Sequence, residues 1–203
     1  MDIQTKRADS HPLNAAQIEK VFNHTFFATL GTILQGGASE PIYIPKGQNP
    51  KDYQDIQFEQ APNTENNSIF YRADYASSAL HEVAHWCIAG EKRRRQLDYG
   101  YWYSPDGRDL EQQKVFEKVE VKPQALEYAF SLAANIEFRV SADNLSLPNY
   151  NSFEFSKAVI SQYKRYQQLG FPPRAQAFIT ALKSSKQDLS YNQNNSTGNL
   201  CSV

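Results

Sequence analysis

Two histidines stand four positions apart in the stretch HEVAH, and their side chains could bind one metal ion together. On a helix this spacing puts both residues on one face, so His81 and His85 would present two imidazoles to a single cation. Glu82 lies between them and could act as a general base. Zn²⁺ with a bound water would then give a metallopeptidase, whereas Fe²⁺ with free neighbouring positions could activate dioxygen. Spacing alone favours the peptidase, but the five residues exclude neither chemistry.

A third protein ligand is required, and the supply of histidines points to a carboxylate. The chain has four histidines, and the remaining two are His11, near the N-terminus, and His24, in the first predicted helix. The acids of the downstream helix are therefore the candidates, namely Glu120, Glu127 and Glu137. We predict Glu127, with Glu120 second, because apolar neighbours surround Glu127 and an ionised carboxylate in such company needs a partner. In the alternative, Glu127 points to solvent.

Two helices must position these groups. The segment 74–95 has Asp74 as a plausible N-cap, good helix formers and no proline, so HEVAH is expected in the middle of a helix. Apolar residues flank the motif, and half-buried imidazoles without partners would lose hydration at a cost of about 1 to 3 kcal/mol each. Pro123 is expected to begin the second helix, which would run to about Val140 and carry Glu127.

The rest of the chain predicts an α+β fold. A capping box formed by Asn14 and Gln17 begins an amphipathic helix that is expected to continue past Ile33. Residues 41–45 and 68–72 are β-prone, and the segments 151–170 and 172–185 have helical periodicity. We therefore expect a mainly helical single domain with a small β-sheet.

Length and composition set the remaining bounds. The 203 residues fit one domain, for which we expect a flexible N-terminus at 1–12, a catalytic domain at 13–186 and a disordered tail at 187–203. A net charge of −1 gives no general field for nucleic acid, and no apolar run is long enough for a membrane helix. The two cysteines are far apart in sequence, which is typical of a reducing compartment. A cytoplasmic protein is the expectation.

Two longer segments resemble a known family. SALHEVAHWCIAGEKRRRQLDYGYWYSPDGRD at 78–109 and VKPQALEYAFSLAA at 121–134 closely resemble the elongation factor P hydroxylase family, and the resemblance runs from about residue 13 to 185. It implies a metallopeptidase-like scaffold reused for oxidation. The implied activity is a monooxygenase that uses Fe²⁺ and dioxygen to hydroxylate the modified, lysylated lysine of elongation factor P. Zn²⁺ or another divalent ion is the alternative metal.

The resemblance also implies roles for the motif residues. The two-histidine, one-carboxylate metal site of the family falls on His81 and His85, with Glu127 as the expected acid. Glu82 would then be a base or orienting group beside the metal ligands. Elongation factor P is the expected partner, and a monomer is favoured.

An aromatic and acidic cluster follows the metal helix. Tyr101 and three neighbouring aromatic residues lie between Asp98 and Asp106, and a slot with aromatic walls and a carboxylate would suit a long alkyl-ammonium chain. Asp98, Tyr101 and Asp106 are therefore the predicted substrate-binding residues. A β-hairpin whose aromatic residues simply pack together is the alternative.

Three functions from different classes remain open on the residues alone. The first is a side-chain hydroxylase, the second a zinc metallopeptidase with Glu82 as base, and the third a binding module whose metal is structural. The basic run at 92–95 either complements the helix dipole or docks an acidic protein face. Cys87 is expected to be a small buried hydrophobic residue.

Overall fold

We obtained a computed structural model that describes residues 11–72, 75–98, 108–142 and 151–197, with side chains described up to Lys186. Five α-helices, three strands and two short 3₁₀ helices follow one another in this part of the chain. In chain order they are α1 (Ala15–Leu30), β1 (Thr32–Ala38), β2 (Ile42–Ile44), η1 (Pro50–Tyr53), β3 (Asn67–Arg72), α2 (Ala76–Ile88), η2 (Arg93–Arg95), α3 (Leu110–Ala134), α4 (Phe153–Leu169) and α5 (Pro173–Thr197). The expected α+β fold, mainly helical with a small sheet, is confirmed.

The sheet is small, and β3 is its central strand. The strand order is β1-β3-β2, with β1 parallel and β2 antiparallel to β3. Ile69 of β3 lies beside Leu34 on one side and Tyr43 on the other. The ladder of β1 shifts register between Gln35 and Ala38, where Gly37 adopts a positive φ of 81° that an L side chain rarely adopts.

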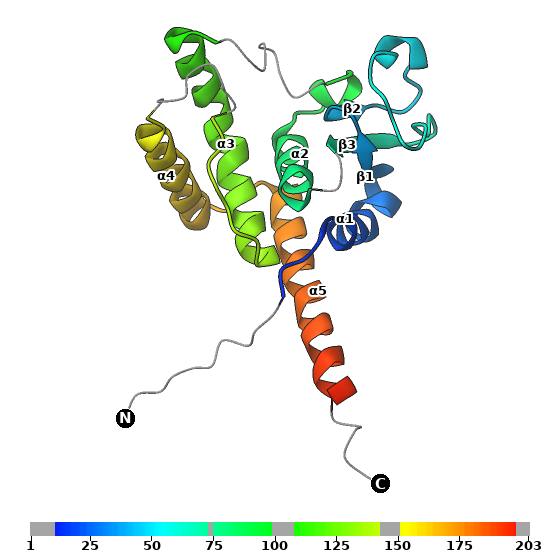
Figure 1. The fold of residues 1–203 in the computed structure, drawn as a ribbon, viewed down its shortest axis with the longest axis vertical. Helices are drawn as coiled ribbons and strands as arrows, with labels where there is room; N and C mark the ends of the chain where they lie inside the picture. Colours follow the sequence, from blue (N-terminus) through cyan, green and yellow to red (C-terminus); the bar gives the residue numbers. More distant parts are fainter. Residues whose placement is uncertain (1–10, 73–74, 99–107, 143–150, 198–203) are drawn as a thin grey trace.

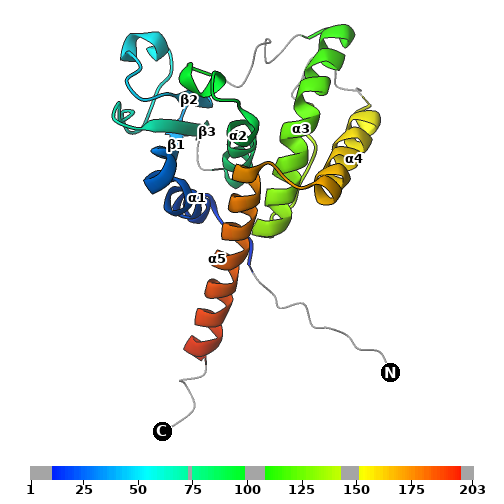
Figure 2. The ribbon, with the colours of Figure 1, turned by 180° about the vertical axis from the view of Figure 1, so that it is seen from behind.

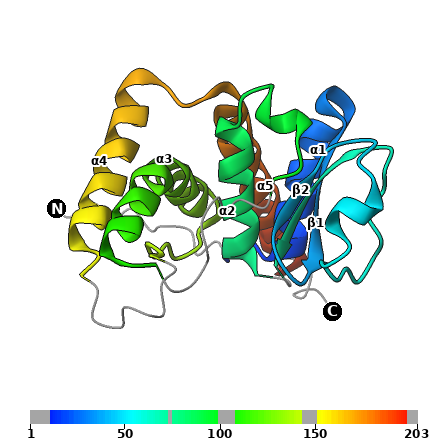
Figure 3. The ribbon, with the colours of Figure 1, turned by 90° about the horizontal axis from the view of Figure 1, so that it is seen from above.

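The metal-motif helix α2 lies between the sheet and α3 (Figure 3). α1 and α5 pack beside α2, and α4 covers the far side of α3 (Figure 1). The largest cluster of buried side chains joins α1, α2, α3 and α5, with Phe22, Leu80, Leu126, Phe130 and Phe178 among its members. α2 is therefore held on several sides by apolar packing, which gives the motif a fixed position.

The first helix ends earlier than its hydrophobic spacing predicts. The capping box of Asn14 and Gln17 is confirmed, but Gly31 stops the helix in a left-handed conformation (φ 55°). Ile33, which we expected to be helical, lies instead in β1. Thr32 and Leu34, on either side of Ile33, are both buried. This short apolar run fits the period of a helix as well as that of a strand, and Gly31 decides between the two.

The helix that carries the acids begins well before Pro123. α3 starts at Leu110, where Asp109 accepts hydrogen bonds from the backbone N–H groups of Glu111 and Gln112 and completes a capping box. Pro123 lies inside the helix, so the expected start there is wrong. The helix ends at Ala134, short of the expected Val140, because Asn135 adopts a left-handed conformation with φ 60°.

The last helix is longer than the periodicity predicts. α5 begins at Pro173 and continues to Thr197, into the segment for which the sequence predicts disorder. Its far end leads away from the packed body (Figure 1). No proline or glycine interrupts the segment from 174 to 197, which removes the usual reasons for a helix to stop. No helix in the described ranges is both long and apolar enough to cross a membrane.

Candidate metal centre

The two histidines of the motif face one another from successive turns of α2. The ring nitrogens Nε2 of His81 and Nε2 of His85 lie 3.0 Å apart, and the ring centroids are 4.7 Å apart. Other residues of α2, namely Leu80, Val83 and Ala84, are fully buried in the core. Because the apolar side fixes the rotation of the helix, both imidazoles are directed towards α3.

Glu120 of α3 meets both histidines. Its Oε1 lies 3.3 Å from Nε2 of His85, and its Oε2 lies 3.7 Å from Nε2 of His81. The carboxylate is almost fully buried, and Oε2 has no hydrogen-bond partner within the described part of the chain. One ligand atom from each of His81, His85 and Glu120 lies within 4.8 Å of the other two.

Glu127 contacts the opposite side of the His81 ring. Its Oε2 lies 2.8 Å from Nδ1 of His81, and the carboxylate is also buried. A neutral imidazole that donates from Nδ1 keeps the lone pair on Nε2, so this contact directs that lone pair towards Glu120 and His85. The acid that we predicted first and the acid that we predicted second thus both reach the histidine pair, on different sides of the His81 ring.

The donor set fits a divalent metal ion. Two imidazole nitrogens and one carboxylate are ligands that Fe²⁺, Zn²⁺ and related ions accept, and three protein ligands leave coordination positions free. Among the described residues the buried Oε2 of Glu120 has no hydrogen-bond partner, and a carboxylate oxygen left in this state is costly. The residues present are therefore chemically suited to hold a metal between α2 and α3.

The electrostatics of the metal-free cluster follow from burial and from the close opposite charges. Burial alone would lower the pKa of His81, but the hydrogen bond to Glu127 and the charges of nearby carboxylates raise it to about 10. Burial alone would raise the pKa of Glu120, but the charge of His85 and its hydrogen bond lower it to about 2. With its pKa raised in this way the His81 ring carries a proton at neutral pH, and a metal ion bound at Nε2 would have to displace it.

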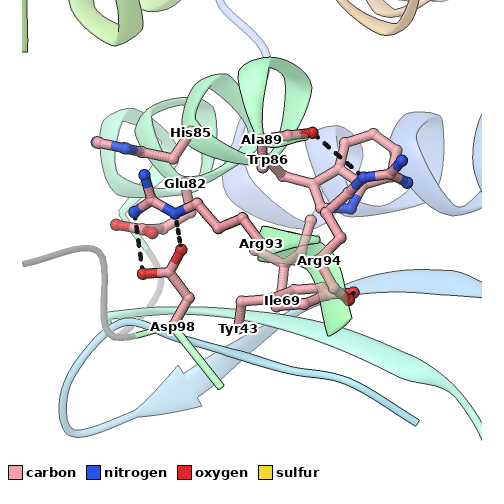
Figure 4. Close-up of a pocket in the computed structure, with 9 residues that line it drawn as sticks. All are labelled: Tyr43, Ile69, Glu82, His85, Trp86, Ala89, Arg93, Arg94 and Asp98. Carbon is pink, nitrogen blue, oxygen red and sulfur yellow. Dashed lines mark hydrogen bonds and ion pairs between the residues drawn. The ribbon is translucent and has the colours of Figure 1, made fainter. Parts of the chain in front are cut away.

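Glu82 lies beside the candidate metal ligands rather than among them. It is buried, and its side chain lines a pocket together with His85 (Figure 4). Burial raises the pKa of Glu82, although the charges of His81 and His85 act in the opposite direction. A carboxyl group at this position can therefore hold a proton next to the metal-binding residues.

The pocket has mostly apolar walls that come from the sheet and from the end of α2. Tyr43 of β2, Ile69 of β3 and Trp86 of α2 supply these walls, and Ala89 continues them after α2. Its polar lining consists of four charged residues and His85. The charged residues are Glu82, Arg93, Arg94 and Asp98. An aliphatic chain with polar groups would find both kinds of surface here.

A charged pair lines the pocket beside the sheet wall. Arg93 binds the carboxylate of Asp98 through two nitrogens, and its Nη2 lies 3.0 Å from Oδ1 (Figure 4). The backbone of Asp98 pairs with Tyr43, through N–H to O distances of 2.7 and 3.0 Å. The chain after α2 therefore occupies the free edge of β2 at Tyr43, where an extended peptide would otherwise add as a strand.

The remaining predicted residues divide into three groups. Glu137 lies beyond the end of α3, His11 precedes α1 and His24 lies on α1, and all three are exposed, so none of these reaches the histidine pair. Tyr101 and Asp106 lie outside the described residues, as does Asp74, the predicted N-cap of α2. Within the described ranges, Cys87 is buried in the main core as expected.

Sequence reasoning missed the walls of the pocket. Tyr43 and Ile69 belong to strands more than ten residues from the motif, and no spacing rule connects them to it. The sequence shows Arg93 as part of a basic run, although an aspartate five residues later, Asp98, could have suggested an ion pair. Trp86 follows His85 directly, and we considered it only as an apolar flank.

Comparisons with known proteins agree on one family. The family model described as elongation factor P hydroxylase matches residues 21–196 of this chain. A curated protein of Haemophilus influenzae named elongation factor P lysine hydroxylase is 43% identical over 162 residues, which are 80% of this chain and 83% of that protein. The matched region contains α2 and α3 in full, and with them the two histidines and both acids.

Proposed function

Because this chain belongs to the elongation factor P hydroxylase family, we propose that it hydroxylates the modified, lysylated lysine side chain of elongation factor P. The observation that carries the proposal is the meeting of His81, His85 and Glu120 at one point between α2 and α3. We propose Fe²⁺ as the metal and dioxygen as the cosubstrate. Bound there, Fe²⁺ would supply the one-electron chemistry that oxygen activation needs and that side chains lack.

We assign the third ligand position to Glu120, in place of our earlier preference for Glu127. Glu120 approaches the Nε2 atoms of both histidines, whereas Glu127 approaches only Nδ1 of His81. In this assignment Glu127 accepts the Nδ1–H hydrogen bond, fixes the tautomer of His81 and raises the basicity of its Nε2. Carboxylates commonly have this role beside metal-bound histidines.

The pocket next to His85 is proposed to receive the substrate side chain. Tyr43, Ile69 and Trp86 would pack along its methylene groups and exclude water, which favours a reaction at carbon. Glu82 would hold or move a proton at its buried carboxyl group, and Asp98 would contact a substrate amine. Since Asp98 closes the β2 edge at Tyr43, the substrate is expected to enter by its side chain and not as an added strand.

Mass spectrometry of elongation factor P tests this function directly. Purified protein loaded with Fe²⁺ and supplied with a two-electron donor should add one oxygen atom to the modified lysine in air, with ¹⁸O incorporated from labelled dioxygen and the second oxygen atom leaving as water. The His81→Ala variant and anaerobic samples should give no mass gain. Oxygen incorporation from labelled water alone, or unchanged activity in the His81→Ala variant, would rule out the proposed site.

A second experiment tests the metallopeptidase alternative, which neither comparison supports. A zinc-loaded preparation should leave the elongation factor and a mixed peptide library intact. Peptide cleavage that is lost in a Glu82→Gln variant would instead support peptidase chemistry, because the glutamate would then be the base that activates water.

A further inference from the structure

The end of α2 is bound by an arginine from another helix. Arg174, in the first turn of α5, donates from Nη2 to the carbonyl oxygens of Trp86 (2.9 Å), Cys87 (3.0 Å) and Ala89 (2.6 Å). The carbon of its guanidinium lies 4.9 Å from the centroid of the Trp86 ring. One side chain, 85 or more positions away in sequence, thus contacts the segment directly after His85.

This contact replaces a cap that α2 lacks. Helices leave their last carbonyls without intrahelical partners, and a left-handed glycine often satisfies them. α2 ends instead with Ala89 in an extended conformation, and its first residue has no side-chain cap either. Trp86 and Cys87 belong to the last turn, so their carbonyl groups depend on Arg174 within the described part of the chain.

The last turn of α2 is also where the metal-binding and pocket residues meet. The carbonyl of His85 accepts the backbone N–H of Ala89 at 3.0 Å, and Trp86 and Ala89 both line the pocket (Figure 4). If this turn frays, the His85 ring and the pocket wall move together. A guanidinium that bonds three carbonyls and stacks on an indole restrains the turn in position and in rotation.

We propose that Arg174 is a positioning residue of the metal centre: it fixes the last turn of α2 and thereby the direction of Nε2 of His85. The inference rests on the proposed metal site and goes beyond it, because it assigns a role in that site to α5. Figure 2 shows the start of α5 next to α2. Arg174 acts through the backbone and contacts neither the metal-binding atoms nor the pocket interior.

The test compares metal affinity with helix order in three variants of Arg174. Arg174→Met should weaken Co²⁺ binding about 10- to 100-fold in competition with a chromophoric chelator, the range seen when supporting groups of metal ligands are lost. In the metal-free protein, hydrogen exchange of the Ala89 amide should become faster. Arg174→Lys should recover part of the affinity, because an ammonium bonds carbonyls but does not stack as a plane. Millimolar guanidinium should partly restore Arg174→Ala.

Two controls separate positioning from a general loss of stability. Arg165→Met removes an exposed arginine from α4 and should leave Co²⁺ affinity unchanged. Val159→Ala truncates a buried side chain in a separate cluster and lowers stability away from α2. It should not weaken Co²⁺ binding at temperatures where the protein stays folded.

The outcomes distinguish this inference from the proposed function. If the unaltered protein binds no Co²⁺, the metal site itself fails. If it binds Co²⁺ but Arg174→Met stays within twofold of it, or Val159→Ala weakens binding equally, Arg174 has no positioning role. Should Arg174→Met not fold, the lysine variant and the guanidinium rescue of Arg174→Ala still decide: full affinity in the lysine variant, or no rescue, would overturn the inference.

Discussion

At the scale of single residues, two acids on one helix contact the same imidazole with different consequences. Glu120 and Glu127 are two turns apart on α3, and His81 lies between their carboxylates. The sequence limits the third ligand to a few acids but does not separate these two. Both have apolar neighbours and both are buried, so only the side on which each approaches the ring distinguishes them.

Isosteric substitutions of the two acids should separate their roles. Glu127→Gln should weaken metal binding about 10- to 100-fold, because it removes a charged acceptor from Nδ1 of His81 but keeps the ligands. Glu120→Gln should weaken binding more, since it neutralises the third ligand itself. Isothermal titration with Co²⁺ measures both. The reverse order, with the greater loss in Glu127→Gln, would return the ligand role to Glu127.

Metal binding should depend steeply on pH. The raised pKa of His81, about 10, means that its ring carries a proton at neutral pH in the metal-free protein, and this proton must leave when a metal binds. Affinity should therefore rise about tenfold per pH unit between pH 7 and 9. Titrations in buffers of different ionisation enthalpy count the protons released, and a flat profile would contradict the shift.

The raised pKa of His81 and the lowered pKa of Glu120 also determine how the stability of the metal-free protein depends on pH. A raised histidine pKa stabilises the fold below the usual value of 6.5, and this contribution is lost as the pH rises towards 10. The lowered pKa of Glu120 stabilises the fold above its usual value of 4.5, and this contribution is lost as the pH falls towards 2. Urea titrations of the metal-free protein should show both trends, whereas a Glu120→Gln variant should lack the second.

At the scale of elements, the cap of α3 stabilises the helix that carries Glu120 without positioning that residue itself. Asp109 caps the first turn, and its replacement by alanine should lower the free energy of unfolding by about 1 kcal/mol. Glu120 lies three turns further along the helix and is held by packing, so metal affinity should stay nearly unchanged. Chemical denaturation measures the first effect, and a large loss of metal binding would show that the cap also positions the site.

At this scale, the sequence predicts features that depend on neighbouring residues and misses those that depend on tertiary packing. Local signals identified the capping box at Asn14 and the helical placement of His81 and His85, because caps and spacing act over a few residues. The interior position of Pro123 was missed, since tertiary packing of α3 outweighs the loss of one backbone hydrogen bond. The contact of Arg174 with α2 joins residues almost 90 positions apart and has no local signal.

At the scale of the whole molecule, a metal held between α2 and α3 should stabilise the fold. An ion at 100 times its dissociation constant adds about 2.7 kcal/mol to the free energy of unfolding, provided that it does not bind the unfolded chain. A chelator should therefore lower the melting temperature of the metal-loaded protein. It should have no effect on a His85→Ala variant, and an equal effect on both proteins would place the stabilising ion elsewhere.

The division of the chain into a flexible segment at 1–12, a catalytic domain at 13–186 and a tail at 187–203 stays a prediction. The family match extends to residue 196, and α5 to Thr197, so the helix and the match end almost together.

Two sources supply the two halves of the site. Within the described residues, the side chains suited to the ion come from α2 and α3, whereas Tyr43, Ile69 and the strand edge at Asp98 come from the sheet and the chain beside it. Mutations at Tyr43 or Ile69 should therefore change substrate binding more than metal binding, whereas mutations at His85, which lines the same pocket, should change both. A design that transferred only α2 and α3 to another scaffold would carry the candidate metal ligands but would lack the pocket walls from the sheet, which we expect to select the substrate.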